Sequence, residues 1–277
     1  MKSHPAPAAL IAGDGALPGE VARRMADEGI DVTVYTFAPG GDKFSFLPGD
    51  RVISLLNLPG AGGTLSLKAF LADLSARGIR RAGMAGLIPK MVMYGGTDNS
   101  LKELLKNGDN DDHALLGRIA AALEMVGVEV FHYGAWLKES MASEGQIAGR
   151  KFTPAEAADV EYGKKILAAT LPLSFGQAVV IAGGAVVAIE AMEGTDRMIQ
   201  RAGELLRGTP GVVVKMMRPD QDSRYDIPTV GPRTLEEMDR AGLTALALET
   251  GRVIILEREK FSSLAGELSI AAEGILP

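Results

Sequence analysis

The residue types best suited to chemistry gather in one segment, Val212 to Gly231, which reads VVVKMMRPDQDSRYDIPTVG. Lys215 lies in a stretch that its apolar neighbours predict to be a buried strand, where a lysine without a partner is unusual. Arginines and aspartates then alternate over nine residues: Arg218, Asp220, Asp222, Arg224 and Asp226. Guanidinium groups hold phosphate oxygens and carboxylates hold divalent cations, so the segment is typical of a site for a phosphorylated ligand and a metal. A solvated, salt-bridged loop would have the same composition.

Two glycine-containing turns could present backbone N–H groups to an anion at the start of a helix. Gly13-Asp14-Gly15 follows an apolar stretch, but Pro18 stands where the dinucleotide-binding fingerprint has its third glycine, and no acidic residue follows the next strand. The segment EGTDR, residues 193–197, follows an apolar hairpin and also precedes a predicted helix. A plain tight turn explains the first segment equally well, and a helix cap from Thr195 or Asp196 explains the second.

A third polar segment, Asp109 to His113, contains three carboxylates that could hold Mg²⁺. Its aspartates also suit the N-cap of the helix that follows, and this second interpretation is the stronger one. The chain has no cysteine, which excludes disulfides, zinc–thiolate sites and thiol catalysis. It has only three histidines and lacks the G-x-S-x-G turn of a serine hydrolase. Chemistry on a phosphate would therefore depend on carboxylates, lysine and arginine.

The elements that must position these residues alternate between strands and helices in the first half of the chain. Periodic apolar patterns predict, in chain order, a strand over 8–12, a helix over 18–28, strands over 31–37 and 51–56, a helix over 65–77, a strand over 79–86, a helix over 113–126 and a strand over 128–132. Repeated strand–helix order indicates a parallel, doubly wound sheet. We therefore expect an N-terminal Rossmann-like domain over residues 1–134.

The pattern breaks at 135–152, where glycines stand among polar residues, and we expect a linker there. Thr153-Pro154-Ala155-Glu156 then fits a capping box at the start of a helix. Gly183-Gly184 predicts the turn of a hairpin between two apolar strands. A strand over 212–217, a long loop, a helix over about 234–241 and strands over 243–248 and 252–256 complete the second domain. The predicted class is α/β, with a mixed α/β C-terminal domain over 153–277.

Composition narrows the class of protein. The net charge of −6 is unfavourable for nucleic-acid binding, which depends on many lysines and arginines facing phosphates, so we expect no nucleic-acid partner. The longest apolar stretch, Ala178 to Ile189, has twelve residues and is too short to span a bilayer as a helix. Because no secretory signal is visible, we expect a cytoplasmic protein.

Four segments together resemble one family. They are LIAGDGALPGEVA (10–22), AIEAMEGTDRMIQRAG (188–203), VVVKMMRPDQD (212–222) and SRYDIPTVG (223–231), in the expected order. The family is that of the UDP-2,3-diacylglucosamine pyrophosphatases of the LpxI type. The resemblance covers nearly the whole chain and weakens between Ala38 and Met93. Gly108 to Leu116 is similar to the family's GDDALL helix start, with an insertion around Asn110.

The resemblance implies a reaction in lipid A biosynthesis. Water and a divalent metal, Mg²⁺, would cleave the diphosphate of UDP-2,3-diacylglucosamine to give UMP and 2,3-diacylglucosamine 1-phosphate (lipid X). Asp226, in the stretch RYDIPTVG, matches the family's essential acidic residue and would bind the metal, orient water, or do both. The partner would be a nucleotide-sugar lipid, with at most peripheral contact with the inner membrane, and we expect a homodimer.

These observations define the predicted site. Asp226 is the catalytic residue, Asp226 and Asp222 are metal ligands, and the substrate-binding residues are Gly13, Gly15, Asp112, Gly194, Thr195, Asp196, Lys215, Gln221, Arg224 and Thr229. Two alternatives stay open. One is a protein that binds the nucleotide-sugar lipid without turning it over. The other is a nicotinamide-dependent oxidoreductase, which rests only on the turn that contains Gly13 and Gly15.

Overall fold

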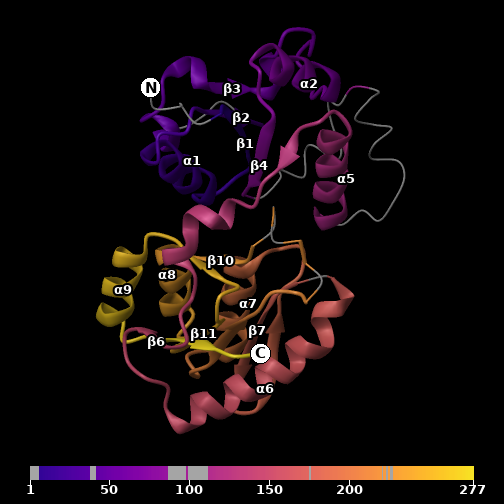
Figure 1. Ribbon diagram of the computed structural model, residues 1–277. Coiled ribbons are helices and arrows are strands. Elements are labelled where there is room, and N and C mark those ends of the chain that lie inside the picture. Colours follow the sequence, from indigo (N-terminus) through magenta and orange to yellow (C-terminus); the bar gives the residue numbers. More distant parts are fainter. Residues whose placement is uncertain are drawn as a thin grey trace. The chain divides into compact units, whose positions relative to one another are not determined.

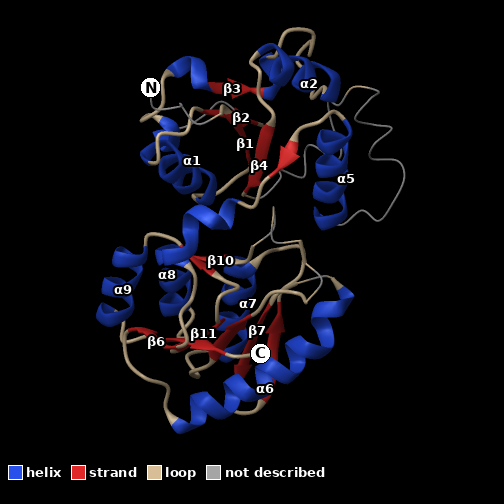
Figure 2. Cartoon of the chain, in the orientation of Figure 1, coloured by secondary structure: helices blue, strands red, loops and turns tan. Residues whose placement is uncertain are grey.

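The computed structural model describes residues 6–37, 42–86, 98, 112–174, 176–219, 221, 222, 224 and 227–277. The chain forms two compact units: unit 1 comprises Met1–Leu137 and Asp222–Asp226, and unit 2 comprises Lys138–Gln221 and Ile227–Pro277. Figure 1 follows the chain through both units, and Figure 2 distinguishes their helices from their strands. Each unit has a β-sheet and helices of its own, so the α/β class expected from the sequence is confirmed.

Unit 1 is built on a five-stranded sheet in which every pair of neighbouring strands is parallel. In spatial order the strands are β3 (Val52–Ser54), β2 (Val32–Thr36), β1 (Ala8–Ala12), β4 (Arg81–Ala85) and β5 (Glu129–Val130). Both β1 and β2 are buried along their whole length, as expected for strands covered on both faces. The strand order steps outward from β1 in both directions, which is the Rossmann-like arrangement that the alternating pattern predicts.

The helices of unit 1 pack on this sheet through aliphatic and aromatic side chains. Those in the described part of the unit are α1 (Leu17–Asp27), α2 (Leu67–Ala76) and α5 (Asp112–Met125), with short 3-10 turns η1 (Asp42–Phe44), η2 (Gly49–Arg51) and η3 (Leu55–Asn57). Tyr35 of β2 meets Phe70 of α2 edge to face, with ring centroids 4.9 Å apart. Its hydroxyl donates to Asp73 Oδ2 at 2.7 Å. Burial, and then this hydrogen bond, raise the pKa of Tyr35, so the phenol stays protonated and ties α2 to the sheet.

Unit 2 contains a six-stranded mixed sheet. In spatial order its strands are β6 (Gly145–Ala148), β13 (Ala271–Ile275), β11 (Ala245–Glu249), β9 (Val212–Lys215), β7 (Ala178–Ala182) and β8 (Ala185–Ile189). The neighbours β13, β11 and β9 are parallel, whereas β7 is antiparallel to both β9 and β8. Because β7 runs opposite to both of its neighbours, β8, β9 and β11 all end at the same edge of the sheet.

The side chains of this sheet alternate between two cores. Val179, Ile181, Val212 and Val214 pack with Val160 and Leu167 of α6 (Pro154–Thr170). Val180 and Val213 point to the other face and pack with residues of α7 (Thr195–Leu206), α8 (Pro232–Arg240) and α9 (Arg258–Glu267). The two-residue period of a strand thus assigns α6 to one face and the other three helices to the opposite face. Within the described residues, no helix has the length and apolar composition to cross a membrane.

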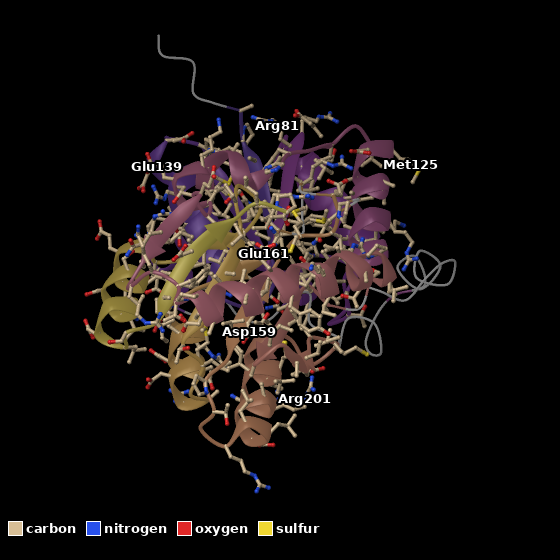
Figure 3. All side chains as sticks on the ribbon, turned by 90° about the horizontal axis from the view of Figure 1, so that it is seen from below. Arg81, Met125, Glu139, Asp159, Glu161 and Arg201 are labelled. Carbon is tan, nitrogen blue, oxygen red and sulfur yellow. The ribbon has the colours of Figure 1, made fainter. Side chains whose placement is uncertain are left out.

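Local sequence signals account for the start of unit 2. Thr153 and Glu156 form the predicted capping box, and Gly183-Gly184 forms the predicted hairpin turn between β7 and β8. Both glycines have positive φ angles, 57° and 75°, which glycine adopts without steric cost. The carboxylate of Asp159, on α6 in Figure 3, accepts their N–H groups at 2.9 and 2.7 Å. The hairpin is therefore fastened to the helix that packs beneath it.

One segment differs in detail from the sequence expectation. Residues 135–152, expected as a linker, contain most of the 3-10 helix η4 (Tyr133–Ser140) and strand β6, which pairs with β13. The two strands predicted over 243–248 and 252–256 are present and lie in different sheets. β11 joins the main sheet, whereas β12 (Ile254–Ile255) forms a separate two-stranded parallel sheet with β10 (Thr229–Val230).

Glu156 makes the stability of the protein depend on pH. Burial alone would raise the pKa of this carboxyl, but hydrogen bonds from Arg150, Thr153 and Thr244 outweigh burial and lower the pKa to about 2. Arg150 contacts both carboxylate oxygens, at 2.7 and 2.6 Å. A carboxyl with a lowered pKa in the folded chain stabilises the fold above its unfolded-state pKa, about 4.3. That contribution is lost as the pH falls through this value toward about 2.

We predict that Glu156→Gln lowers the free energy of unfolding by about 1–3 kcal/mol at pH 6, because charge-assisted hydrogen bonds are lost. The deficit should shrink at pH 3, where wild type is losing the same contribution. Urea unfolding at both pH values measures it, and Glu144→Gln, at an exposed glutamate, controls for the loss of one charge. An equal deficit at the two pH values would contradict the assignment.

Gly176 lies against the backbone that follows β8. A Cβ atom added to it would clash with the carbonyl oxygen of Glu190, which is main chain and cannot rotate away. We predict that Gly176→Ala lowers the free energy of unfolding by about 1–3 kcal/mol through overpacking. Gly266→Ala is the matched control, because a Cβ there meets nothing within 4 Å and alanine favours helix α9. Denaturant unfolding should give a lower free energy of unfolding for Gly176→Ala than for Gly266→Ala. Equal values would show that the backbone near Gly176 shifts to accommodate a Cβ atom without loss of stability.

Candidate functional site

The candidate site of unit 2 lies at the edge where β8, β9 and β11 end. Glu190 follows β8, Lys215 is the last residue of β9, and Glu249 is the last residue of β11. These three charged side chains are buried, with exposed fractions of 9%, 6% and 1%. Ligands of open α/β sheets bind outside the carboxyl ends of the strands, so this edge is where the topology favours a site.

A chain of hydrogen bonds joins two of these residues through Thr195. Lys215 Nζ donates to Thr195 Oγ1 at 2.6 Å, and Thr195 Oγ1 donates to Glu190 Oε1 at 2.6 Å. The other carboxylate oxygen of Glu190 accepts the backbone N–H of Gln177 at 2.9 Å. The structure therefore brings Thr195 and Lys215, both predicted from the sequence, into direct contact. Glu190, which sequence reasoning missed, completes the chain.

The amino end of α7 lies beside this chain. Gly194 is its N-cap, with a φ angle of 80°, and supplies no side chain to cap the helix. The first intrahelical bond runs from Met198 N to Gly194 O, so the helix leaves the N–H groups of its first turn for other acceptors. The amino end of a helix with such N–H groups favours the binding of anions. Together with the Lys215 ammonium, it gives the site the donors that a phosphate group requires.

Asp196 brings a carboxylate to the same helix start. Burial raises the pKa of Asp196, and the neighbouring charges of Glu237 and Glu190 act in the same direction. Arg233 and Lys215 oppose this shift, and Arg233 Nε lies 3.0 Å from Asp196 Oδ2. On the other side of α7, Arg201, labelled in Figure 3, contacts the Ile189 carbonyl at 2.9 Å and so ties the helix to the end of β8.

Glu249 fixes the chain where it leaves β9. Its Oε2 accepts the N–H of Met217 at 2.7 Å, and its Oε1 lies 3.3 Å from Arg252. The same guanidinium donates to the carbonyl of Arg218 at 2.8 Å. Arg218 also contacts Ser174 through its side chain, and its N–H donates to Gln221 Oε1 at 3.3 Å. The loop that carries the predicted site residues therefore starts from a buried, hydrogen-bonded anchor.

The remaining predicted residues of the loop also have partners, and Arg224 Nη1 donates to Glu124 Oε1 of α5 at 2.6 Å. The carboxylate of Asp222 accepts from Arg224 Nη2 at 2.7 Å and from Arg224 Nε at 3.0 Å, and this interaction raises the pKa of Arg224. Thr229 starts β10 and donates to the carbonyl of Ile227 at 3.0 Å. Asp226, the predicted catalytic residue, lies outside the described residues, so its role stays a prediction.

The glycine turn of unit 1 follows β1, as predicted. Gly13 N donates to the Ala85 carbonyl at 2.8 Å, and Gly15 has a φ angle of 92° that favours glycine. Lys43 Nζ lies 3.4 Å from the Gly13 carbonyl and 3.3 Å from the Gly15 carbonyl, a contact that the sequence did not suggest. Asp112 is the first residue of α5, and its side chain lies outside the described part of the structure.

Among the described residues, no group of three or more histidine, aspartate or glutamate side chains is placed to hold a metal. Glu190, Glu249 and Asp222 each have both carboxylate oxygens in hydrogen bonds with protein groups. Asp222 as a metal ligand stays a prediction.

Sequence reasoning missed Glu190 and Glu249 although each had a signal. Both are single carboxylates at the end of an apolar strand, after AVVAI and within ALALE. A carboxylate there is almost never fully buried without a partner. The partners could not be identified in advance, because they come from segments that the sheet brings together.

Comparison with known proteins covers both units. Models of the LpxI N-terminal domain and the LpxI C-terminal domain match residues 7–140 and 143–272. The chain is 29% identical over 281 residues to the UDP-2,3-diacylglucosamine pyrophosphatase LpxI of Caulobacter vibrioides, with 97% of each chain covered. The resemblance carried by the four sequence segments is thereby confirmed. The two domain models account for most of the chain, which therefore belongs to the LpxI family.

Proposed function

We propose that this chain hydrolyses the diphosphate of UDP-2,3-diacylglucosamine to UMP and 2,3-diacylglucosamine 1-phosphate in lipid A biosynthesis. The observation that carries the proposal is the similarity, over 97% of both chains, to a relative named as a UDP-2,3-diacylglucosamine pyrophosphatase. Many activities share one fold, so similarity of fold alone would not support a function. The similarity here is in sequence and extends over both domains, so it includes the segments that carry the predicted site residues.

The geometry of unit 2 is consistent with chemistry on a diphosphate. Negative charge grows on the departing phosphate as the phosphoanhydride bond breaks, and donors fixed in advance stabilise such a transition state. The ammonium of Lys215 and the N–H groups at the start of α7 are donors of this kind. We assign these groups to the phosphates. Gly13, Gly15, Asp112, Gln221, Arg224 and Thr229 remain predicted contacts with the rest of the substrate.

Mg²⁺ is part of the proposal through Asp226. When bound, the ion would neutralise charge on the phosphates and lower the pKa of a bound water. We propose Asp226 and Asp222 as its ligands, and the metal proposal rests first on Asp226, which matches the essential acidic residue of the family. The residues of this chain hold the phosphate charge independently of the ion, through Lys215 and α7.

The chemistry of the substrate suggests where the protein works. Two acyl chains would keep UDP-2,3-diacylglucosamine in a lipid surface, while its uridine diphosphate faces water. We propose a cytoplasmic protein that contacts the inner membrane peripherally and acts as a homodimer. Light scattering of the purified chain measures the oligomeric state, and flotation with vesicles measures the membrane contact.

Asp226→Asn should lower the rate of UMP release by about 10²–10⁴-fold, because a neutral amide can neither bind a cation nor accept a proton as the carboxylate does. Chromatographic measurement of UMP from UDP-2,3-diacylglucosamine tests this. Asp239→Asn, at an exposed aspartate of α8, is the control and should match wild type. Wild-type turnover in Asp226→Asn would remove Asp226 from the mechanism.

Removal of divalent cations should stop the reaction without unfolding the protein. We predict that excess chelator abolishes UMP release, that added Mg²⁺ restores it, and that the thermal unfolding midpoint changes little. Each unit has a hydrophobic core, so we expect the fold to persist without the ion. Full turnover in chelator would exclude a required metal. Absence of UMP with and without Mg²⁺ would instead favour a protein that binds the lipid without turning it over.

A further inference from the structure

We propose that Glu190 and Thr195 act together as positioning residues for Lys215, and that the hydroxyl of Thr195 is not itself a donor to the substrate. The structure joins the three residues in one directed chain, from ammonium to hydroxyl to carboxylate. In this arrangement the chain aims the remaining N–H groups of Lys215 at a phosphate group. The identity of that phosphate, part of the diphosphate of a nucleotide-sugar lipid, rests on the proposed function.

The direction of the chain follows from the number of protons available. An ammonium only donates, a carboxylate only accepts, and a threonine hydroxyl has a single proton. Lys215 Nζ and Glu190 Oε1 both lie 2.6 Å from Thr195 Oγ1. Thr195 must therefore accept from Lys215 and donate to Glu190. Its proton is committed, so the hydroxyl has none left for a phosphate oxygen.

Burial explains why the chain is needed. Lys215 is 6% exposed and Glu190 is 9% exposed, and a buried charge is costly unless it is paired and hydrogen-bonded. Neither residue is within ion-pair distance of the other in the described structure, so the hydroxyl of Thr195 connects the two charges. A direct ion pair would turn the ammonium toward Glu190. Through the intervening hydroxyl, the carboxylate of Glu190 balances the charge of the ammonium, and only one of the three N–H groups of Lys215 is used.

Both positioning residues are held in place by the backbone. Glu190 is fixed by the N–H of Gln177, and the contact of Gly176 with the Glu190 carbonyl leaves no room for a side chain at 176. Thr195 is the first residue of α7, and its β-branched side chain has few rotamers in a helix. The ammonium is therefore located by two groups that cannot easily move, which is what a pre-formed phosphate site requires.

Substitutions at Thr195 and Glu190 can distinguish positioning of Lys215 from a general contribution to the stability of the fold. Thr195→Val keeps the shape of the side chain but removes both hydrogen bonds, whereas Thr195→Ser keeps the hydroxyl. Glu190→Gln cannot accept from Gln177 and Thr195 with both of its terminal atoms, because one of them becomes a donor. If Glu190 acts through Thr195, the effects of the two substitutions on ligand binding should not add.

The experiment measures binding of inorganic diphosphate by calorimetry, with release of UMP from UDP-2,3-diacylglucosamine as a second readout. We expect Thr195→Val and Glu190→Gln each to weaken diphosphate binding by roughly tenfold or more, as for loss of a hydrogen bond to a charged group. Thr195→Ser should remain within about twofold of wild type, and the double variant should be no weaker than the weaker single variant within about twofold. Thr209→Val, at an exposed threonine, is the matched control.

Each outcome decides the proposal. Wild-type diphosphate affinity in Thr195→Val would overturn it, as would additive losses in the double variant or a wild type that binds no diphosphate. Thermal unfolding checks that each variant folds, and if Glu190→Gln does not fold, the contrast between Thr195→Val and Thr195→Ser carries the test. A wild type that binds diphosphate with the expected variant pattern but releases no UMP would refute the proposed reaction and leave the positioning role intact.

Discussion

A buried ammonium is stable only where another group balances its charge, and unit 2 is arranged around that requirement at Lys215. The balancing carboxylate, Glu190, stands at the end of a different strand and acts through a threonine at the start of a helix. Two strands, β8 and β9, must therefore end where helix α7 begins. Strand β7 lies between β8 and β9 and is antiparallel to both, so β8 and β9 run in the same direction and end at the same edge of the sheet.

The packing of the sheet supports this edge from both faces. α6 covers one face through Val160 and Leu167, and α7 covers the other through Met198, Ile199 and Ala202. The amino end of α7 can then approach the strand ends only because its apolar side is buried against the sheet. A second buried carboxylate, Glu249, holds the chain as it leaves β9.

The sequence predicts the elements of this protein better than it predicts their partners. Alternating apolar patterns gave the parallel sheet of unit 1, and Thr153 to Glu156 gave the start of α6, because both signals are local. Helix α9 was not predicted, although the helical spacing of Phe261, Leu264, Ala265 and Leu268 indicates a helix there. The pairing of β12 with β10 had no local signal at all. Lys215 and Thr195 could be singled out by residue type, whereas the partner of Glu190 could not, since the contact depends on segments that the sheet brings together.

Hydrolysis of a nucleotide-sugar lipid differs from binding alone in converting one diphosphate into two monophosphates. ³¹P NMR of the purified protein with UDP-2,3-diacylglucosamine and Mg²⁺ observes this conversion. The two coupled diphosphate resonances should disappear and be replaced by two monophosphate resonances, one from UMP and one from 2,3-diacylglucosamine 1-phosphate. Diphosphate resonances that persist at stoichiometric protein concentration over hours would contradict hydrolysis by this chain.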